Sequence, residues 1–154
     1  MLTAWNSLGY EIGNEFLCIA WAWNAKGWGP FSDVNTLSAI ISSTPLSAPW
    51  NLAGTTNSTH VTLTWSPITS TPENGYAQIS DYKVLWNGGG NSNDFVPKLT
   101  STSNTTTAVI SLGTIGLNYR FWVLATNIHG DGPASSFIDV LFATSPGVMD
   151  PPTV

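Results

Sequence analysis

The sequence predicts an all-β protein made of short strands. Apolar and polar residues alternate at every second position in several short segments, and clusters of Gly, Pro, Asn and Ser separate these segments. Across the whole sequence, no segment combines a helical apolar period with capping residues. One loop motif also occurs twice, as NAKGWGPFS at 24–32 and as NIHGDGPAS at 127–135. This duplication indicates an internal repeat of β units.

Every residue shared by the two copies of the motif recurs 103 positions later in the chain. The shared residues are Asn24, Gly27, Gly29, Pro30 and Ser32 in the first copy and Asn127, Gly130, Gly132, Pro133 and Ser135 in the second. TAWNSLG (3–9) matches TAVISLG (107–113) at an offset of 104, so one residue has been gained or lost between them. We therefore expect a tandem repeat with a period of about 103 residues, of which this chain holds about one and a half periods.

The strands of the complete repeat are marked by their alternation and β-branched residues. The clearest of them, in order, are WNLAG (50–54), HVTLTW (60–65), ISDYKVLW (79–86), TTTAVISL (105–112), NYRFWVLATN (118–127) and SFIDVLFA (136–143). Turn-rich stretches at 69–78 and 87–94 separate them. About seven short strands in one repeat, with an inward Trp65 early and Tyr119 late, are typical of an immunoglobulin-like β-sandwich.

The complete repeat closely resembles a fibronectin type III domain. The residues that carry the resemblance are VTLTWSP (61–67), ISDYKVLW (79–86), YRFWVLATN (119–127) and GDGPAS (130–135), with Pro49 and Leu52 near the start. The resemblance spans 46–146. It implies that the repeated GxGP motif is the loop between the last two strands, where glycine permits backbone angles closed to other residues. It also implies that the Tyr119 hydroxyl bonds to the backbone near Leu112, a bond that Phe16 cannot make.

The resemblance implies a domain division. Residues 1–44 are expected to be the C-terminal half, strands E to G, of one such domain. Residues 45–147 form a complete domain, and 148–154 begin a following repeat or a linker. A half-domain leaves a sheet edge and a core face open. We expect the missing strands to come from upstream sequence or from another chain.

Composition excludes several classes of partner. Charged residues make up 8 % of the chain, which carries four Lys+Arg and a net charge of -5. These values argue against binding nucleic acid or docking on anionic membranes. The longest apolar run, FLCIAWAW (16–23), is too short to insert into a bilayer. A surface rich in Ser, Thr and Asn favours an extracellular or cell-surface location. The one cysteine, Cys18, is expected to be a small core residue.

No residue pattern indicates catalysis, a cofactor or a metal. His60 opens a strand and His129 lies in a loop, and neither has a partner at the spacing of metal ligands. The carboxylates are scattered singly, whereas glycoside hydrolysis needs two that face each other. We therefore predict a protein that is not an enzyme.

Two sequons are candidates for N-glycosylation, at Asn57 and Asn104. Both fall in expected loops or at strand starts, where a glycan could project into solvent. Their number is what the Asn, Ser and Thr content produces by chance, so occupancy stays open.

An outward row of apolar residues is the most informative oddity. If Phe16, Cys18, Ala20 and Ala22 face a core, the alternating residues face outward. The contact-surface candidates are Ile19, Trp21, Trp23 and Trp28 in the partial repeat, and Trp122 and Leu124 in the complete one. Three interpretations stay open: a neighbouring domain or chain covers this row, glycans stack on it, or side chains of its own sheet cover it.

The first functional hypothesis is a non-enzymatic structural repeat of an extracellular fibre, surface coat or adhesin. Its partners would be other copies or neighbouring repeats of the same protein, with N-glycans as a further candidate. The alternative is a spacer or binding module in a larger secreted enzyme or cell-surface receptor. A third, a cytosolic scaffold, fits less well with the low charge.

Overall fold

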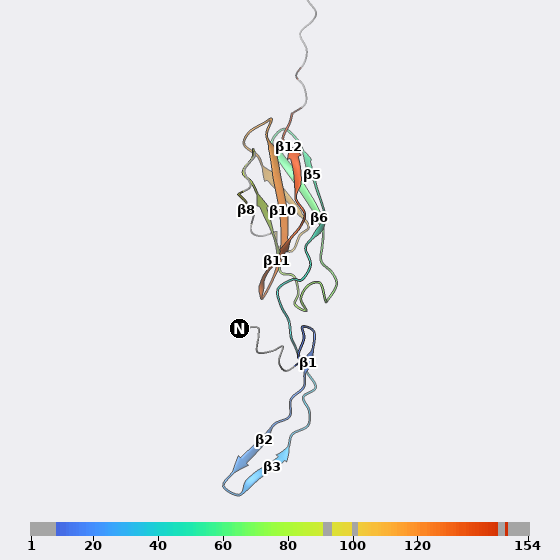
Figure 1. Ribbon diagram of the computed structural model, residues 1–154, viewed down its shortest axis with the longest axis vertical. Helices are drawn as coiled ribbons and strands as arrows, with labels where there is room; N and C mark the ends of the chain where they lie inside the picture. The colour runs from blue at the N-terminus through green and yellow to red at the C-terminus, as the bar shows by residue number, and fades with distance from the viewer. Residues whose placement is uncertain (1–8, 91–93, 100–101, 145–146, 148–154) are drawn as a thin grey trace, which may run out of the picture.

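The computed structural model describes residues 9–90, 94–99, 102–144 and 147, and it contains β-strands and connecting loops over these residues. Residues from about 45 to 144 form a β-sandwich, and residues 9–41 form a long hairpin that projects from one end of it (Figure 1). The predicted all-β sandwich is therefore confirmed.

One sheet of the sandwich has three antiparallel strands in the order β5-β6-β9. These are β5 (Trp50–Thr56), β6 (His60–Ser66) and β9 (Thr107–Ser111). Val61 of the central strand pairs with Thr56 on one side and Ile110 on the other.

The second sheet has five strands, in the order β11-β10-β7-β8, with β12 also paired to β10. They are β7 (Asp81–Trp86), β8 (Val96–Leu99), β10 (Asn118–Asn127), β11 (Gly130–Ala134) and β12 (Ile138–Leu141). The last two strands pair with different halves of the long β10, and the chain leaves the sheet briefly between them.

The core lies between the two sheets and follows the alternation in the sequence. The inward residues are Val61, Leu63 and Trp65 on β6, Tyr82 and Val84 on β7, and Tyr119, Phe121, Val123 and Ala125 on β10. Trp65 is 5 % exposed and meets the Tyr82 ring edge-on, with ring centroids 5.7 Å apart. The predicted inward positions are thus confirmed.

Tyr119 makes the backbone bond that the sequence predicts. Its hydroxyl accepts a hydrogen bond from the Thr114 N–H at 3.0 Å and lies 3.2 Å from the Thr114 carbonyl oxygen, to which it donates. Thr114 stands two residues beyond Leu112. This bond anchors the turn that leads into β10.

The N-terminal hairpin consists of two paired parts. β1 (Glu15–Phe16) pairs with β4 (Ala39–Ile40), and β2 (Trp21–Asn24) pairs with β3 (Gly27–Phe31). The expected strand E of this half falls on residues that mostly lie outside the described ranges. The prediction that Cys18 is a core residue is wrong, because its thiol is exposed and no second sheet covers this side of the described hairpin.

The segment that joins hairpin and sandwich is held by loops of the sandwich. The Ser43 N–H donates to the Gly75 carbonyl at 2.8 Å, and the Asn127 side-chain amide donates to the Ser43 carbonyl at 2.7 Å. Pro45 is fully buried beside Gly132. The linker therefore belongs to the folded end of the sandwich.

Candidate contact surface

The hairpin β2–β3 and the hairpin β10–β11 share the same hydrogen bonds, 103 positions apart. In the first, the Ala20 N–H donates to Ser32 Oγ at 3.0 Å, and the Ser32 N–H donates to the Ala20 carbonyl at 2.7 Å. In the second, the Val123 N–H donates to Ser135 Oγ at 3.0 Å, and the Ser135 N–H donates to the Val123 carbonyl at 2.8 Å. The repeated serine therefore makes the same two bonds just beyond the register shift in both hairpins.

The turns of the two hairpins are also alike. In each, the asparagine Oδ1 accepts a hydrogen bond from the backbone N–H two residues later, at 2.8 Å from Lys26 and 2.9 Å from His129. The following glycines, Gly27 and Gly130, have φ of 122° and 125°. These angles are open to glycine and strained for other residues, which explains why the glycine is repeated.

The same register shift places equivalent side chains on the outer face of each hairpin. Trp21 pairs with Phe31 and Trp23 with Trp28, and the register shifts between the two pairs. The equivalent pairs in the sandwich are Leu124 with Ala134 and Thr126 with Asp131, with the same shift. The two outer faces can therefore be compared position by position.

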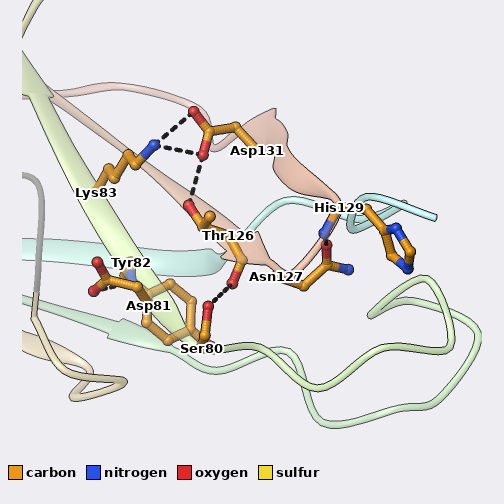
Figure 2. A network of polar contacts seen from close by, with 8 residues as sticks. All are labelled: Ser80, Asp81, Tyr82, Lys83, Thr126, Asn127, His129 and Asp131. Atoms are coloured by element: carbon orange, nitrogen blue, oxygen red, sulfur yellow. Dashed lines mark hydrogen bonds and ion pairs between the residues drawn. The ribbon is translucent and has the colours of Figure 1, made fainter. Parts of the chain in front are cut away.

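On the sandwich, two of these four positions, Thr126 and Asp131, are polar. Lys83 Nζ lies 2.7 and 2.9 Å from the two carboxylate oxygens of Asp131, and the Thr126 hydroxyl donates to the same carboxylate at 2.7 Å (Figure 2). The hydrogen bonds from Lys83 and Thr126 hold the pKa of the Asp131 carboxyl below its ordinary value, although partial burial opposes the shift.

On the projecting hairpin, the same positions are aromatic. Trp23 replaces Thr126, Trp28 replaces Asp131, and Trp21 and Phe31 replace Leu124 and Ala134. We call these four residues the aromatic face. The Trp21 ring centroid lies 5.1 Å from that of Trp28 and 4.9 Å from that of Phe31, in tilted and edge-on contacts. Trp23 and Trp28 are each 66 % exposed. One backbone geometry thus presents an ion-pair network in one hairpin and an exposed aromatic cluster in the other.

The family model described as "Fibronectin type III domain" matches residues 47–140 of the chain. The chain belongs to the fibronectin type III family. Chicken contactin-5 is 36 % identical over 119 residues, which cover 77 % of this chain and 11 % of contactin-5. Mouse neogenin is 30 % identical over 76 % of this chain and 8 % of its own length. Protein turtle of Drosophila melanogaster is 30 % identical over 71 % of this chain and 7 % of its own.

The chain thus spans about a tenth of the length of these curated relatives. Solved structures agree on the fold. Domains A168–A170 of titin match 85 % of this chain with a TM-score of 0.65 and 18 % identity, over 41 % of that chain. The FN1–FN3 domains of chicken CNTN1 match 88 % of this chain with a TM-score of 0.57 and 18 % identity, over 44 % of that chain.

The outward residues predicted within the fibronectin type III domain, Leu124 and Trp122, are both covered at least in part. Leu124 is 9 % exposed, so its assignment to an exposed contact surface is wrong. It lies on a central strand between Lys83 and Ala134, whose side chains flank it on both sides. Trp122 is half-buried, with the Phe137 ring 5.7 Å from its own. The interpretation that side chains of its own sheet cover the row applies to these two residues.

On the projecting hairpin, the predicted residues Ile19, Trp21, Trp23 and Trp28 are exposed. Phe31 completes the aromatic face, and the sequence interpretation missed it. The turn at Asn24–Gly27 alone would place Pro30 opposite Trp21, and the register shift between the Trp21 and Trp23 pairs brings Phe31 there instead.

Both sequon asparagines are exposed. Asn57 Oδ1 accepts hydrogen bonds from the Thr59 N–H at 2.8 Å and from the Thr59 hydroxyl at 3.2 Å. Asn104 lies in a turn with φ of 61°. Both side chains remain candidates for glycosylation.

Within the described ranges, no group of three His, Cys, Asp or Glu side chains could hold a metal ion. The same ranges contain no helix long and apolar enough to cross a membrane. A cavity of about 500 Å³ between the start of β5 and the stretch from β11 to β12 is lined by Trp50, Phe137 and neighbouring residues, and this lining includes no ionisable side chain. It offers neither an acid nor a base for catalysis.

Proposed function

We propose that this fibronectin type III chain is a non-enzymatic structural repeat of an extracellular fibre, surface coat or adhesin. Its aromatic face makes contacts with other copies or neighbouring repeats of the same protein. The observation that carries the proposal is the replacement of the polar network of Asp131 and Thr126 by Trp28 and Trp23 on an otherwise equivalent hairpin.

The energetics favour such a contact. A tryptophan side chain has ~150–250 Å² to bury. Trp23 and Trp28 are each 66 % exposed, so each can lose about two thirds of that area on association, which is worth ~3–4 kcal/mol before the entropic cost of association. With charged residues at 8 % of the chain, few charges have to be desolvated at a contact. Tryptophan clusters of this kind carry much of the binding energy at protein interfaces.

The relatives support a module of a larger assembly. Contactin-5, neogenin and protein turtle are all much longer than the matched segment. The alternative, a spacer in a larger enzyme, is favoured by one neighbour, because the fold also matches the twitchin kinase region of C. elegans with a TM-score of 0.57 and 20 % identity. The cavity lining described above supplies no ionisable side chain of its own.

Sedimentation of the W23T/W28D variant tests the proposal, because this variant gives the hairpin the residues of the sandwich. The original chain is expected to self-associate with concentration, and the variant to associate at least about tenfold more weakly. V109T is the matched control, since Val109 is 61 % exposed on the opposite sheet. An original chain that stays monomeric, or equal association by both proteins, would refute the contact between copies.

A further inference from the structure

One hollow on the sandwich matches the aromatic face in its chemistry. It is the cavity of about 500 Å³ between the start of β5 and the stretch from β11 to β12, and we call it the groove. Its two walls carry Trp50 and Phe137, which are 59 % and 48 % exposed. Its volume falls within the ~300–1,000 Å³ of pockets that enclose small ligands, so the groove has room for large ring side chains.

The Phe137 wall is fixed before anything binds. The Arg120 guanidinium carbon lies 4.1 Å from the Phe137 ring centroid, and the Trp122 ring meets the same ring edge-on at 5.7 Å. Arg120 is held in turn by Asp139, whose two carboxylate oxygens accept hydrogen bonds from the guanidinium at 2.6 and 2.9 Å. A side chain fixed in this way loses little conformational entropy when a partner docks against it.

The Trp50 wall has an irregular backbone. The pairing of β5 with β6 shifts register between Trp50 and Ala53. Between them, Asn51 has a φ of 52°, in the left-handed region that residues other than glycine occupy sparsely. Such residues cluster at ligand clamps, and bulges re-aim side chains beside binding sites. The backbone next to Trp50 therefore fits a binding role.

The groove and the aromatic face also agree in charge. The described residues that line the groove include no ionisable side chain, and the four rings of the aromatic face carry none. Contact between these two surfaces therefore buries no unpaired charge. Contact between two aromatic faces would leave Trp50 and Phe137 in water, whereas contact between face and groove covers both apolar surfaces at once.

Resting on the proposed function, we propose that the aromatic face of one copy of the chain docks into the groove of a second copy. β2 and β3 lie at the end of the hairpin remote from the sandwich, so each aromatic face is held away from the groove of its own chain (Figure 1). The contact joins two different surfaces, and each docked pair keeps one free face and one free groove. Head-to-tail contacts of this kind build rings or open filaments, as a fibre requires.

The available area suits a weak contact that is repeated along an assembly. The exposed parts of the four rings of the aromatic face amount to roughly 350–600 Å². With a similar area covered on the groove side, the contact buries on the order of 1,000 Å² in total, at the lower end of specific protein interfaces. Association between free chains is therefore expected only at high protein concentration.

Two variants that each lose one surface test the docking. W23T/W28D keeps the groove and removes the aromatic face, whereas W50D keeps the aromatic face and places a charge in the groove. In sedimentation, each variant alone is expected to associate at least about tenfold more weakly than the original chain. Their equimolar mixture is expected to form a one-to-one complex and nothing larger, because each member contributes one intact surface. T55D is the matched control and should associate as the original chain does, since Thr55 is exposed on the same strand outside the groove lining.

S136D repeats the test at an exposed serine of the groove lining that lies outside the core. A mixture without a complex would overturn the docking. Self-association of W50D and S136D at the strength of the original chain, with W23T/W28D monomeric, would also overturn it. That result would leave the proposed function standing as a contact between two aromatic faces. An original chain that stays monomeric would refute both.

Discussion

Lys83 on β7 and Asp131 on β11 form a two-oxygen ion pair on the outer face of the sandwich, at the position where the projecting hairpin carries Trp28. The two side chains are 29 % and 43 % exposed, so water screens their attraction. Their pairing ties the β11 edge to the strand on the far side of β10.

Substitution of Asp131 by Asn tests this tie. D131N removes the ion pair and weakens the bond from Thr126, and it is expected to lower the free energy of unfolding by up to about 1 kcal/mol. Urea denaturation measures the change, with D33N in the hairpin as a charge-matched control. A loss above about 3 kcal/mol would contradict an exposed, screened pair.

Acid is expected to weaken the sandwich through two aspartates. Hydrogen bonds from Lys83 and from Arg120 hold the pKa values of Asp131 and Asp139, respectively, below the ordinary value. Each lowered native pKa contributes stability that is complete above the unfolded value of about 3.9 and is lost as pH falls through the native value. Denaturation midpoints between about pH 5 and pH 2 should therefore fall more for the original chain than for D131N/D139N. Parallel curves would show that the two pairs contribute nothing.

Removal of the Tyr119 hydroxyl tests the turn ahead of β10. Y119F loses both bonds to Thr114, so the part-buried backbone N–H and carbonyl of Thr114 lose their side-chain partner. The expected cost is about 1 kcal/mol in the free energy of unfolding. Y10F, at an exposed ring in the N-terminal segment, serves as the control and should change stability little. Equal effects of the two substitutions would contradict the structural role of the corner.

The repeat supplies a matched pair of glycines for testing the linker. A Cβ on Gly132 would lie 2.6 Å from Pro45 Cβ and 2.9 Å from the Pro45 carbonyl oxygen, whereas one on Gly29 would meet nothing nearer than 3.4 Å. G132A is therefore expected to destabilise the sandwich by about 1–3 kcal/mol and to release the linker. G29A should have a much smaller effect. Calorimetry and proteolysis near residue 45 measure both, and equal behaviour would show that the linker is not clamped.

The sequons lead to a prediction about mass. In a eukaryotic secretory host, the chain is expected to exceed 16.4 kDa and to return to that mass after glycosidase treatment. N57Q and N104Q should each remove one step of the added mass. A chain secreted at its bare mass would remove glycans from the proposed function.

Much of the sandwich follows from local pattern. The alternation around Val61, Leu63 and Trp65 correctly assigned their faces, since a side chain on a strand has only two sides to choose between. The repeated motif located the turn only in part, because Gly27 and Gly130 follow the turn with a φ that glycine adopts without strain, whereas the expected loop GxGP itself lies in strands β3 and β11. Alternation alone did not decide which faces are covered, as the corrections at Cys18 and Leu124 show.

The sequence by itself determined most of the strands and the duplicated hairpin, because these depend on residues close together in the chain, but it did not predict β8 or β11 as strands. Tertiary structure decided burial, because burial depends on which strands lie on either side. Leu124 is covered since β7 and β11 flank it on a central strand. Cys18 stands at the position equivalent to Phe121 and falls at the same point of the alternation of faces. It is nevertheless exposed, because no second sheet lies over the described hairpin. Residues at equivalent positions thus acquire opposite environments from their neighbours in space.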